Sequence, residues 1–283
     1  MSESAPADRC YRHPEAPAYI SCQRCERRIC PQCMQEASVG FQCPECVQQG
    51  QKAVRSPKTL AGGAVPGRPG QVSMVIIGLN VAVFVLTDLA QVSAIPAAGV
   101  MAAYDVLDAG TIYPGVLSGG YWRLLTSAFL HAGILHILVN MYALYLFGPF
   151  AERALGTRWF IAAYLTMAVV ASVFVYWLSD PRAFTVGASG AVFGLFGLVL
   201  VLLIRAGQDV RFLLVLLAVN VVISFRAEIS WQAHLGGFLT GLAIGLAIAL
   251  PPRERRVLVQ RALMVALWVG VLGAVAARTA VLA

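Results

Sequence analysis

Charged residues are scarce in this 283-residue chain: they make up 12% of it, whereas apolar residues make up 59%. Soluble domains hold roughly 25% charged and about 45–50% apolar residues. The mean hydropathy of +0.73 deviates in the same direction. The scarcity of charge excludes a single soluble domain and indicates a polytopic membrane protein with a small soluble part.

Two further absences narrow the possibilities. Cysteine does not occur beyond Cys46, and an apolar signal core is missing from Met1 to Arg9, so we expect no cleaved signal peptide. The net charge of +7 does not call for nucleic acid as a partner. Lysine and arginine also gather in the cytoplasmic loops of membrane proteins. The cysteines and the basic residues therefore need separate explanations.

The cysteines occur in pairs of the kind that bind zinc. Seven cysteines and one histidine form four two-ligand knuckles: Cys10 and His13, Cys22 and Cys25, Cys30 and Cys33, Cys43 and Cys46. Two intervening residues let both side chains of a knuckle reach one ion, and eight ligands complete two tetrahedral sites. A disulfide framework would leave one cysteine over and would not explain His13. Residues 1–47 are therefore predicted to form a zinc-binding domain with two structural zinc ions.

This domain resembles a B-box-type or treble-clef zinc finger. The B-box resemblance implies cross-bracing, in which the first and third knuckles share one ion and the second and fourth share the other. Spacing alone also permits sequential pairing. So small a domain buries little core, and the metal must supply its folding energy. Every ligand position is filled, so we expect no catalytic metal. We expect the domain to offer a binding surface to a cytosolic protein partner.

Apolar runs follow a basic linker. Residues 48–71 contain glycine, proline, glutamine and four basic residues, and are predicted to be a flexible linker close to anionic headgroups. Beyond them, seven runs approach the ~20 residues that cross a bilayer: 72–92, 131–150, 158–178, 187–204, 210–226, 232–250 and 257–277. We predict an all-α membrane protein with a six-helix core over 72–250 and a seventh span within 251–283. The amphipathic segment 91–130 should lie in the membrane interface.

Basic residues predict the orientation. With the N-terminus in the cytoplasm, twelve lysines and arginines beyond residue 48 lie inside, and four lie outside: Arg123, Arg182, Arg226 and Arg278. This orientation puts the cysteines in a reducing compartment, where thiolates are available for metal. We therefore expect a multi-pass protein of the cell membrane.

Polar side chains recur at one depth of three predicted spans. The second span carries His131, His136 and Asn140 in its first half, the fourth begins with Ser189, and the sixth has His234 near its start. The predicted topology puts all of them in the outer half of the membrane. Ionisable residues in membrane spans are energetically unfavourable and usually functional.

Glycines provide a way for these spans to meet. The sixth span repeats glycine one turn after His234, and the fourth repeats it after Ser189: Gly237, Gly241 and Gly245; Gly190, Gly194 and Gly197. Small residues at such spacing let helix backbones approach closely. If the two glycine faces pack together, Ser189 and His234 become neighbours.

A serine beside a histidine is the arrangement of a nucleophile and its base. A neutral imidazole takes the hydroxyl proton and later returns it to the leaving group. The serine amide, His136 and Asn140 are candidate donors to an oxyanion. No carboxylate is well placed to orient His234, because Glu228 is six residues earlier in a loop and Asp88 is on another span. The residues therefore predict a dyad.

Three ordered motifs resemble the rhomboid family of intramembrane serine proteases. They are His131-Ala-Gly-Ile-Leu-His136-Ile-Leu-Val-Asn140, Gly187-Ala-Ser189-Gly190 and Ala233-His234-Leu-Gly-Gly237-x-x-x-Gly241, with Tyr121-Trp122-Arg123 upstream. The resemblance covers about residues 72–250. It implies that Ser189 is the nucleophile and His234 the general base, and that His136 and Asn140 form the oxyanion hole.

The same resemblance implies supporting roles. Trp122 and Arg123 would belong to a membrane-embedded loop that supports the site. We expect His131 to be a hydrogen-bonded structural residue. Phe193 stands where many members have a tyrosine packed on the base, so the ring is kept and the hydroxyl lost.

The implied activity is that of a serine endopeptidase that cleaves transmembrane-anchored proteins near the extracytoplasmic face and needs no cofactor for catalysis. A lone serine at a helix start is more often a cap or a packing residue, so the prediction depends on the whole set. A transporter or zinc carrier would show acidic ligands or broken half-helices in paired repeats, and the sequence has neither. An inactive rhomboid-like protein that binds membrane clients would lack Ser189 or His234, and both are present. Client binding remains as an additional role.

Overall fold

The computed structural model describes residues 9–53, 57–225 and 229–283. Three residues used above lie outside these ranges: Arg55, which is one of the four basic residues of the predicted linker, Arg226 and Glu228. The chain divides into two compact units, Met1–Pro57 and Lys58–Ala283, and each is described by itself.

The first unit is built from two short antiparallel hairpins and a helix. Its elements are β1 (Ile20–Ser21) paired with β2 (Arg28–Ile29), η1 (Pro31–Cys33), β3 (Gln35–Glu36) paired with β4 (Phe41–Gln42), and α1 (Pro44–Ala53). Six of its buried core residues are cysteines, and the other two are Ala18 and Ile29. So small an apolar core stabilises little on its own.

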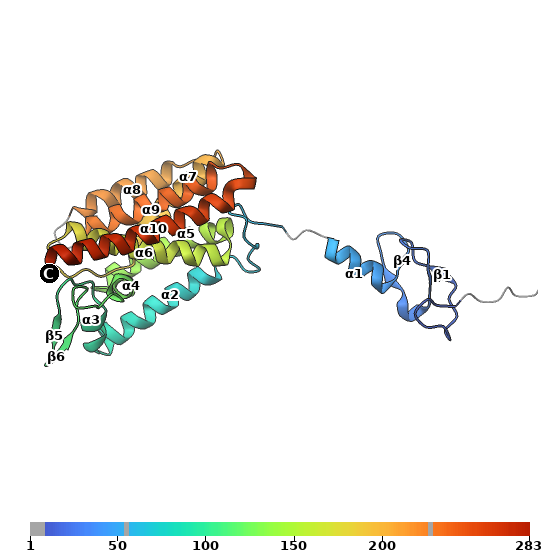
Figure 1. The fold of residues 1–283 in the computed structure, drawn as a ribbon, viewed down its shortest axis with the longest axis horizontal. Coiled ribbons are helices and arrows are strands. Elements are labelled where there is room, and N and C mark those ends of the chain that lie inside the picture. Colours follow the sequence, from blue (N-terminus) through green and yellow to red (C-terminus); the bar gives the residue numbers. More distant parts are fainter. Residues whose placement is uncertain (1–8, 54–56, 226–228) are drawn as a thin grey trace, which may run out of the picture. The chain divides into compact units, whose positions relative to one another are not determined.

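Apolar helices make up most of the second unit (Figure 1). They are α2 with the π-helical turn η2 (Gln71–Phe84, Val85–Leu89), α5 (Ile134–Leu155), α6 (Thr157–Leu178), α7 (Ser189–Arg205), α8 (Arg211–Ser224), α9 (Trp231–Ala249) and α10 (Arg253–Leu282). Each predicted span falls on one of them. Five are long and apolar enough to cross a bilayer, whereas α7 and α8, with 17 and 14 residues, are shorter. The prediction of a polytopic, mostly helical membrane protein is confirmed.

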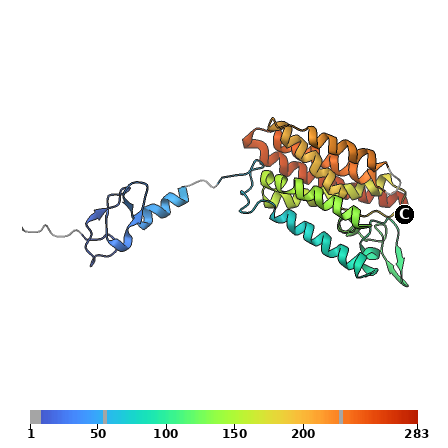
Figure 2. The same ribbon diagram turned by 180° about the vertical axis from the view of Figure 1, so that it is seen from behind.

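The predicted interfacial segment forms short elements at one end of the helical body. They are α3 (Ala94–Gly99), the hairpin β5 (Val106–Asp108) and β6 (Thr111–Tyr113), α4 (Arg123–Thr126) and η3 (Ser127–Phe129). Both ribbon views place this hairpin at the same end as the C-terminus of α10 (Figures 1 and 2). Leu107 and Ile112 of the hairpin are 71% and 67% exposed. Such exposed apolar side chains suit a membrane interface.

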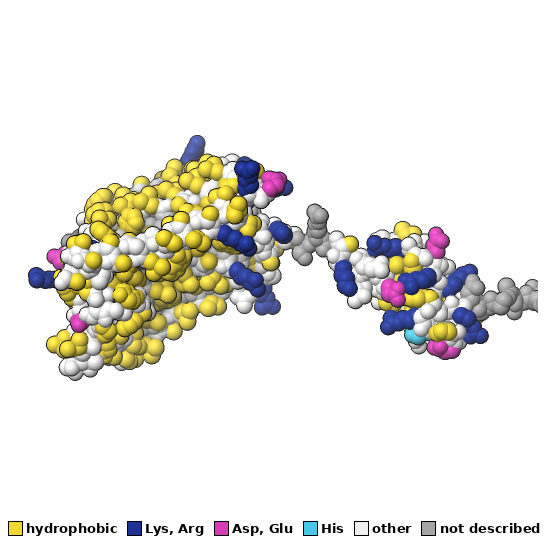
Figure 3. Space-filling view, in the orientation of Figure 1, with side chains coloured by type: hydrophobic (Ala, Val, Ile, Leu, Met, Phe, Trp, Pro, Cys, Tyr) yellow, Lys and Arg dark blue, Asp and Glu magenta, His cyan; other side chains and the backbone are white. Residues whose placement is uncertain are grey.

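Lysine and arginine side chains gather at the other end of this body, while its sides are apolar (Figure 3). Exposed residues there include Lys58, Arg153, Arg158, Arg253 and Arg255. These residues flank the end of α5 and the starts of α6 and α10. This is the side that the distribution of basic residues predicts to be cytoplasmic.

The interval 48–71 is more structured in its described residues than a flexible linker. Residues 48–53 complete α1. The amide of Ala61 donates to the Ala154 carbonyl at 3.2 Å, and the Thr59 hydroxyl donates to that of Leu155 at 3.0 Å. The last carbonyls of a helix have no partner within the helix, and this segment supplies a donor for two of those of α5.

Close backbone contact joins α7 to α9 at the centre of the second unit. A Cβ atom on Gly237 would lie 1.8 Å from the carbonyl oxygen of Gly190, and one on Gly241 would lie 1.8 Å from that of Gly194. The two glycine faces therefore meet, as the sequence analysis expected. This contact holds the starts of α7 and α9 together.

Candidate active site

Ser189 is the first residue of α7, and a glycine with a positive φ lies two residues before it. Gly187 has a φ of +129°, and its amide donates to the Ser127 carbonyl at 2.9 Å. A Cβ atom at Gly187 would lie 2.7 Å from Nε2 of His136 and 3.6 Å from Oγ of Ser189. Glycine is needed here both for the φ angle and for the space. His136 and Ser189 therefore flank the same point.

His234, in the first turn of α9, lies against α7 one turn beyond the serine. Its ring stacks on Phe193 with 3.9 Å between centroids and 8° between planes. Its side chain is buried, with 8% exposed. The ring stacking expected of Phe193 is present. The structure thus brings His234 and Ser189 onto touching segments of α7 and α9.

His136 and Asn140 share one face of α5. The Ala132 amide donates to Nδ1 of His136 at 3.4 Å, so the ring hydrogen of a neutral His136 belongs to Nε2. This is the nitrogen that lies beside Gly187. Asn140 is buried and donates one amide hydrogen to the His136 carbonyl at 2.9 Å. A side-chain amide has a second hydrogen, which is left for another acceptor.

His131 lies three residues before the start of α5, beside His136. It is buried and packs edge-on against His136, with 5.1 Å between ring centroids. Among the described residues, its polar neighbour is the backbone of Phe129, at a geometry outside that of an ordinary hydrogen bond. The contribution visible in the structure is packing against His136.

Arg123 ties together the loop that precedes α5. It is fully buried and donates to four backbone carbonyls: Pro114 at 2.7 Å, Val100 at 2.7 Å, Ala97 at 2.8 Å and Tyr113 at 3.3 Å. Its neighbour Trp122 is half exposed and donates to the Ala98 carbonyl at 2.9 Å. Both residues therefore hold the interfacial segment in shape beside the candidate site.

One polar residue next to the site was not singled out from the sequence. Ser224 ends α8, and its Oγ lies 2.5 Å from Nδ1 of His234. The available signal was weak: a serine four residues after Asn220 in an apolar helix. Among the described residues, this hydroxyl is the partner that the structure gives to Nδ1 of His234.

The knuckles of the first unit gather into two groups. Each holds four ligand atoms within 4.8 Å of one another: Cys10, His13, Cys30 and Cys33; Cys22, Cys25, Cys43 and Cys46. The first and third knuckles are together, as are the second and fourth, which is the cross-braced grouping. The sulfurs of Cys25 and Cys43 are 3.8 Å apart. A tetrahedral zinc with sulfur at about 2.3 Å requires roughly this separation.

The charges within these groups favour a bound cation. Burial alone raises the pKa of Cys10 and Cys22, but surrounding backbone N–H groups outweigh it and bring the pKa to about 6. Burial and neighbouring thiols raise the pKa of Cys33 and Cys46 to about 12. A divalent cation makes it possible for all thiols of a group to ionise together.

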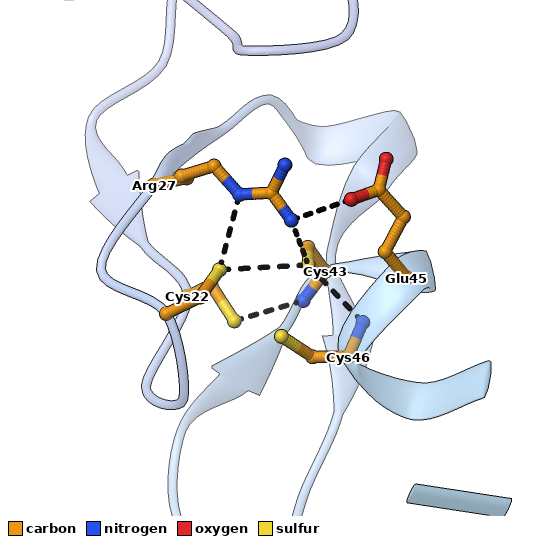
Figure 4. Close-up of polar contacts among 6 residues, drawn as sticks. Cys22, Arg27, Cys43, Glu45 and Cys46 are labelled. Carbon is orange, nitrogen blue, oxygen red and sulfur yellow. Dashed lines mark hydrogen bonds and ion pairs between the residues drawn. The ribbon is translucent and has the colours of Figure 1, made fainter. Parts of the chain in front are cut away.

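Arg27 lies beside the four-cysteine group, as Figure 4 shows. Its Nε donates to Sγ of Cys25 at 3.3 Å, and its Nη2 donates to the Glu45 carboxylate at 2.6 Å. The guanidinium also lies 4.1 Å from the ring centroid of Tyr11. No spacing rule links Arg27 to Glu45, so this contact could not be predicted from the sequence.

Comparison with known proteins adds an independent line of support. The Rhomboid domain family matches residues 118–251, which include every candidate residue from Trp122 to Gly241. The chain is 35% identical over 149 residues to the putative rhomboid protease YdcA of Bacillus subtilis (strain 168), covering 50% of this chain and 74% of YdcA. It is also similar to two longer proteins.

The rhomboid protease GluP of Bacillus subtilis (strain 168) is 33% identical over 166 residues, covering 56% of this chain and 32% of GluP. RHOMBOID-like protein 5 of Arabidopsis thaliana is 33% identical over 147 residues, covering 49% of this chain and 47% of that protein. This chain therefore spans less than half the length of these two relatives. The first unit lies outside the residues matched by the family.

Proposed function

This chain belongs to the rhomboid family, and on that premise we propose that it is an intramembrane serine endopeptidase with Ser189 and His234 as its catalytic dyad. The observation that carries the proposal is the stacking of His234 on Phe193, one turn beyond Ser189 on α7. Relatives named as rhomboid proteases support a peptidase activity.

The proposed reaction is nucleophilic acyl transfer. His234 takes the hydroxyl proton of Ser189, whose Oγ attacks the scissile carbonyl. The resulting oxyanion accepts hydrogen bonds from Nε2–H of His136, the free amide hydrogen of Asn140 and the backbone N–H of Ser189. That last N–H has no partner within α7, because the first amides of a helix lack one, and the helix dipole favours negative charge there. His234 then protonates the leaving amine, and water releases the acyl group.

The substrates we propose are transmembrane proteins. The 17 residues of α7 extend about 25 Å, less than the ~30 Å hydrocarbon core, so Ser189 lies below the membrane surface. The carbonyls of a membrane helix are hydrogen-bonded internally and closed to attack. A substrate must therefore unwind near the cut, and residues of low helix propensity should be preferred there.

We propose that the N-terminus is cytoplasmic and that the site opens to the extracytoplasmic side. A membrane-impermeant thiol reagent applied to intact cells should then label Ser118→Cys, because Ser118 is exposed in the turn between β6 and α4. The native cysteines should stay unlabelled. Labelling of the native cysteines without labelling at 118 would overturn this orientation.

We also propose that the two ligand groups of the first unit bind structural zinc. Zinc would be held by three sulfurs and the His13 nitrogen in one group and by four sulfurs in the other. A unit folded around metal can present a surface to a cytosolic protein partner, and no ligand position is left open for catalysis.

Reaction with a fluorophosphonate probe in detergent tests the dyad. Parent protein should be labelled, and Ser189→Ala should not. Ser179→Ala, at the end of α6, is the control and should be labelled like the parent. The same variants are then compared on a model transmembrane substrate in reconstituted membranes. Cleavage by Ser189→Ala at the parent rate would reject Ser189 as the nucleophile. A parent protein that neither reacts with the probe nor cleaves the substrate would favour a client-binding role.

A further inference from the structure

A short polar chain reaches His234 from α8. Nδ1 of His234 lies 2.5 Å from Oγ of Ser224, and Oγ lies 2.6 Å from the carbonyl oxygen of Asn220. Ser224 and His234 are buried, with 3% and 8% exposed. Buried polar groups of this kind are usually fully paired, so the direction of each hydrogen bond can be worked out.

Ser224 has one hydroxyl hydrogen, and the structure gives it a destination. A carbonyl oxygen only accepts, so the hydroxyl donates to Asn220. The Ser224 oxygen can then only accept a hydrogen bond from His234. Nδ1 of His234 must carry a hydrogen and donate it to Ser224. In a neutral imidazole only one nitrogen carries a hydrogen, so Nε2 of His234 keeps a free lone pair.

His136 has the opposite neighbour at the same atom. Its Nδ1 faces an N–H group, the amide of Ala132, so its Nε2 carries the hydrogen. The two histidines of the site are therefore held in opposite tautomers by what each meets at Nδ1. His234 presents a lone pair at Nε2, and His136 presents an N–H donor at Nε2. The proposed reaction needs these two roles.

We propose that Ser224 is a positioning residue that fixes His234 in its Nδ1–H tautomer and sets the rotation of its ring, so that Nε2 faces Ser189 as the proton acceptor. The inference rests on the proposed dyad. Phe193 stacks on the ring and restrains its plane. The contact at Nδ1 restrains rotation within that plane. A half-turn of the ring would otherwise exchange the nitrogens for carbon positions.

The Ser224 hydroxyl and the Asn220 carbonyl together take the place that the carboxylate has in a Ser-His-Asp triad. When Nε2 accepts the serine proton, His234 becomes an imidazolium, and Nδ1–H stays donated to Ser224. No proton passes from His234 to Ser224. The Asn220 carbonyl polarises the hydroxyl toward the ring and so favours the positive charge. These two neutral groups stabilise the imidazolium without an ionised carboxylate in the membrane, where burial of charge is unfavourable.

Nitrogen NMR of the ring measures the tautomer directly. The chain has four histidines, so protein labelled with ¹⁵N-histidine gives few ring signals, and a His234→Gln spectrum identifies those of His234. In bilayers near neutral pH, Nδ1 of His234 should be protonated and Nε2 should not. Ser224→Ala should give a tautomer mixture, and Ser224→Thr, which keeps the hydroxyl, should restore the parent pattern. A proton on Nε2 in the parent protein would overturn the inference.

Kinetics in reconstituted membranes test the consequence. Ser224→Ala should lower kcat roughly 10- to 100-fold with KM little changed, because the general base is present but misoriented in part of the molecules. Ser224→Thr should recover most of the loss. Unchanged kcat in Ser224→Ala would also reject the inference.

Thr240→Val is the matched control. Thr240 is a buried hydroxyl on α9 that donates to the carbonyl four residues earlier, that of Gly236, at 2.7 Å, as Ser224 does to Asn220. Its kcat should stay near the parent value. An equal loss of kcat in Thr240→Val would mean that removal of any buried hydroxyl lowers kcat, and it would reject a positioning role for Ser224. An inactive parent would reject the proposed function, while the NMR pattern would still decide the tautomer.

Discussion

The two units of this chain are held together by different physical means. The first has a core made mainly of cysteines, arranged as two groups of metal ligands. The second contains no cysteine and relies on the direct approach of helix backbones at glycine. In lipid the hydrophobic effect does not drive helices together, so close packing must do so. In water so small a unit lacks core area, and metal ligation must compensate.

Because of this difference, the two units should be most sensitive to different kinds of substitution. The helical unit should fail when volume is added at a backbone contact, and the cysteine-rich unit should fail when a ligand is removed. Neither failure should spread to the other unit, because each has its own core. The following changes test this separation, beginning with the largest expected effect.

The largest effect is expected from Gly241→Ala. The new Cβ would lie 1.8 Å from the Gly194 carbonyl oxygen, so α7 and α9 must move apart. We expect a loss above the ~1–3 kcal/mol usual for overpacked cores, together with loss of proteolysis. Unfolding in mixed micelles and substrate cleavage measure the two effects.

Gly273→Ala on α10 is the control for the same chemical change. A Cβ there would meet no atom within 4 Å, and the variant should keep parent stability and activity. Equal behaviour of the two variants would contradict the view that backbone contact between α7 and α9 holds the site. Zinc content should stay unchanged in both.

The second change removes one knuckle, through Cys22→Ser combined with Cys25→Ser. Parent protein should contain about two zinc ions per chain and the variant about one or fewer, because each ion needs all four ligands. Limited proteolysis should then cut within residues 9–53, while cleavage of a transmembrane substrate continues at close to the parent rate. Elemental analysis that finds no zinc in gently purified parent protein would end the zinc proposal. Loss of proteolysis in the variant would show that the units are coupled.

Much of this organisation could be predicted from the sequence, because it depends on local patterns of residues. Knuckle spacing identifies metal ligands, and apolar runs identify spans, since each depends on neighbours in the chain. The glycine repeats of α7 and α9 correctly indicated which helices touch. Docking of Thr59 and Ala61 on the end of α5 was missed, because composition alone favours a flexible linker there.

Contacts that depend on how a helix is rotated could not be predicted. Ser224 reaches His234 only because the last turn of α8 faces α9, and an apolar helix gives no periodic signal for that rotation. The contact of His131 depends on the same kind of detail. Its packing against the edge of the His136 ring does not follow from the spacing of the two residues.

The smallest of the three effects on folding is expected from Asn140→Ala, which should separate chemistry from stability in the helical unit. Asn140 is proposed to give one hydrogen bond to the oxyanion, and loss of one such donor lowers kcat roughly 10- to 1,000-fold. Asn80→Ala is a matched control, because Asn80 is also a buried asparagine that donates to the carbonyl four residues earlier, at 2.8 Å, but lies on α2. That variant should keep the parent kcat, and His131→Ala should reduce stability more than kcat. If Asn140→Ala and Asn80→Ala lose activity equally, Asn140 acts through packing, and the oxyanion role assigned to it is wrong.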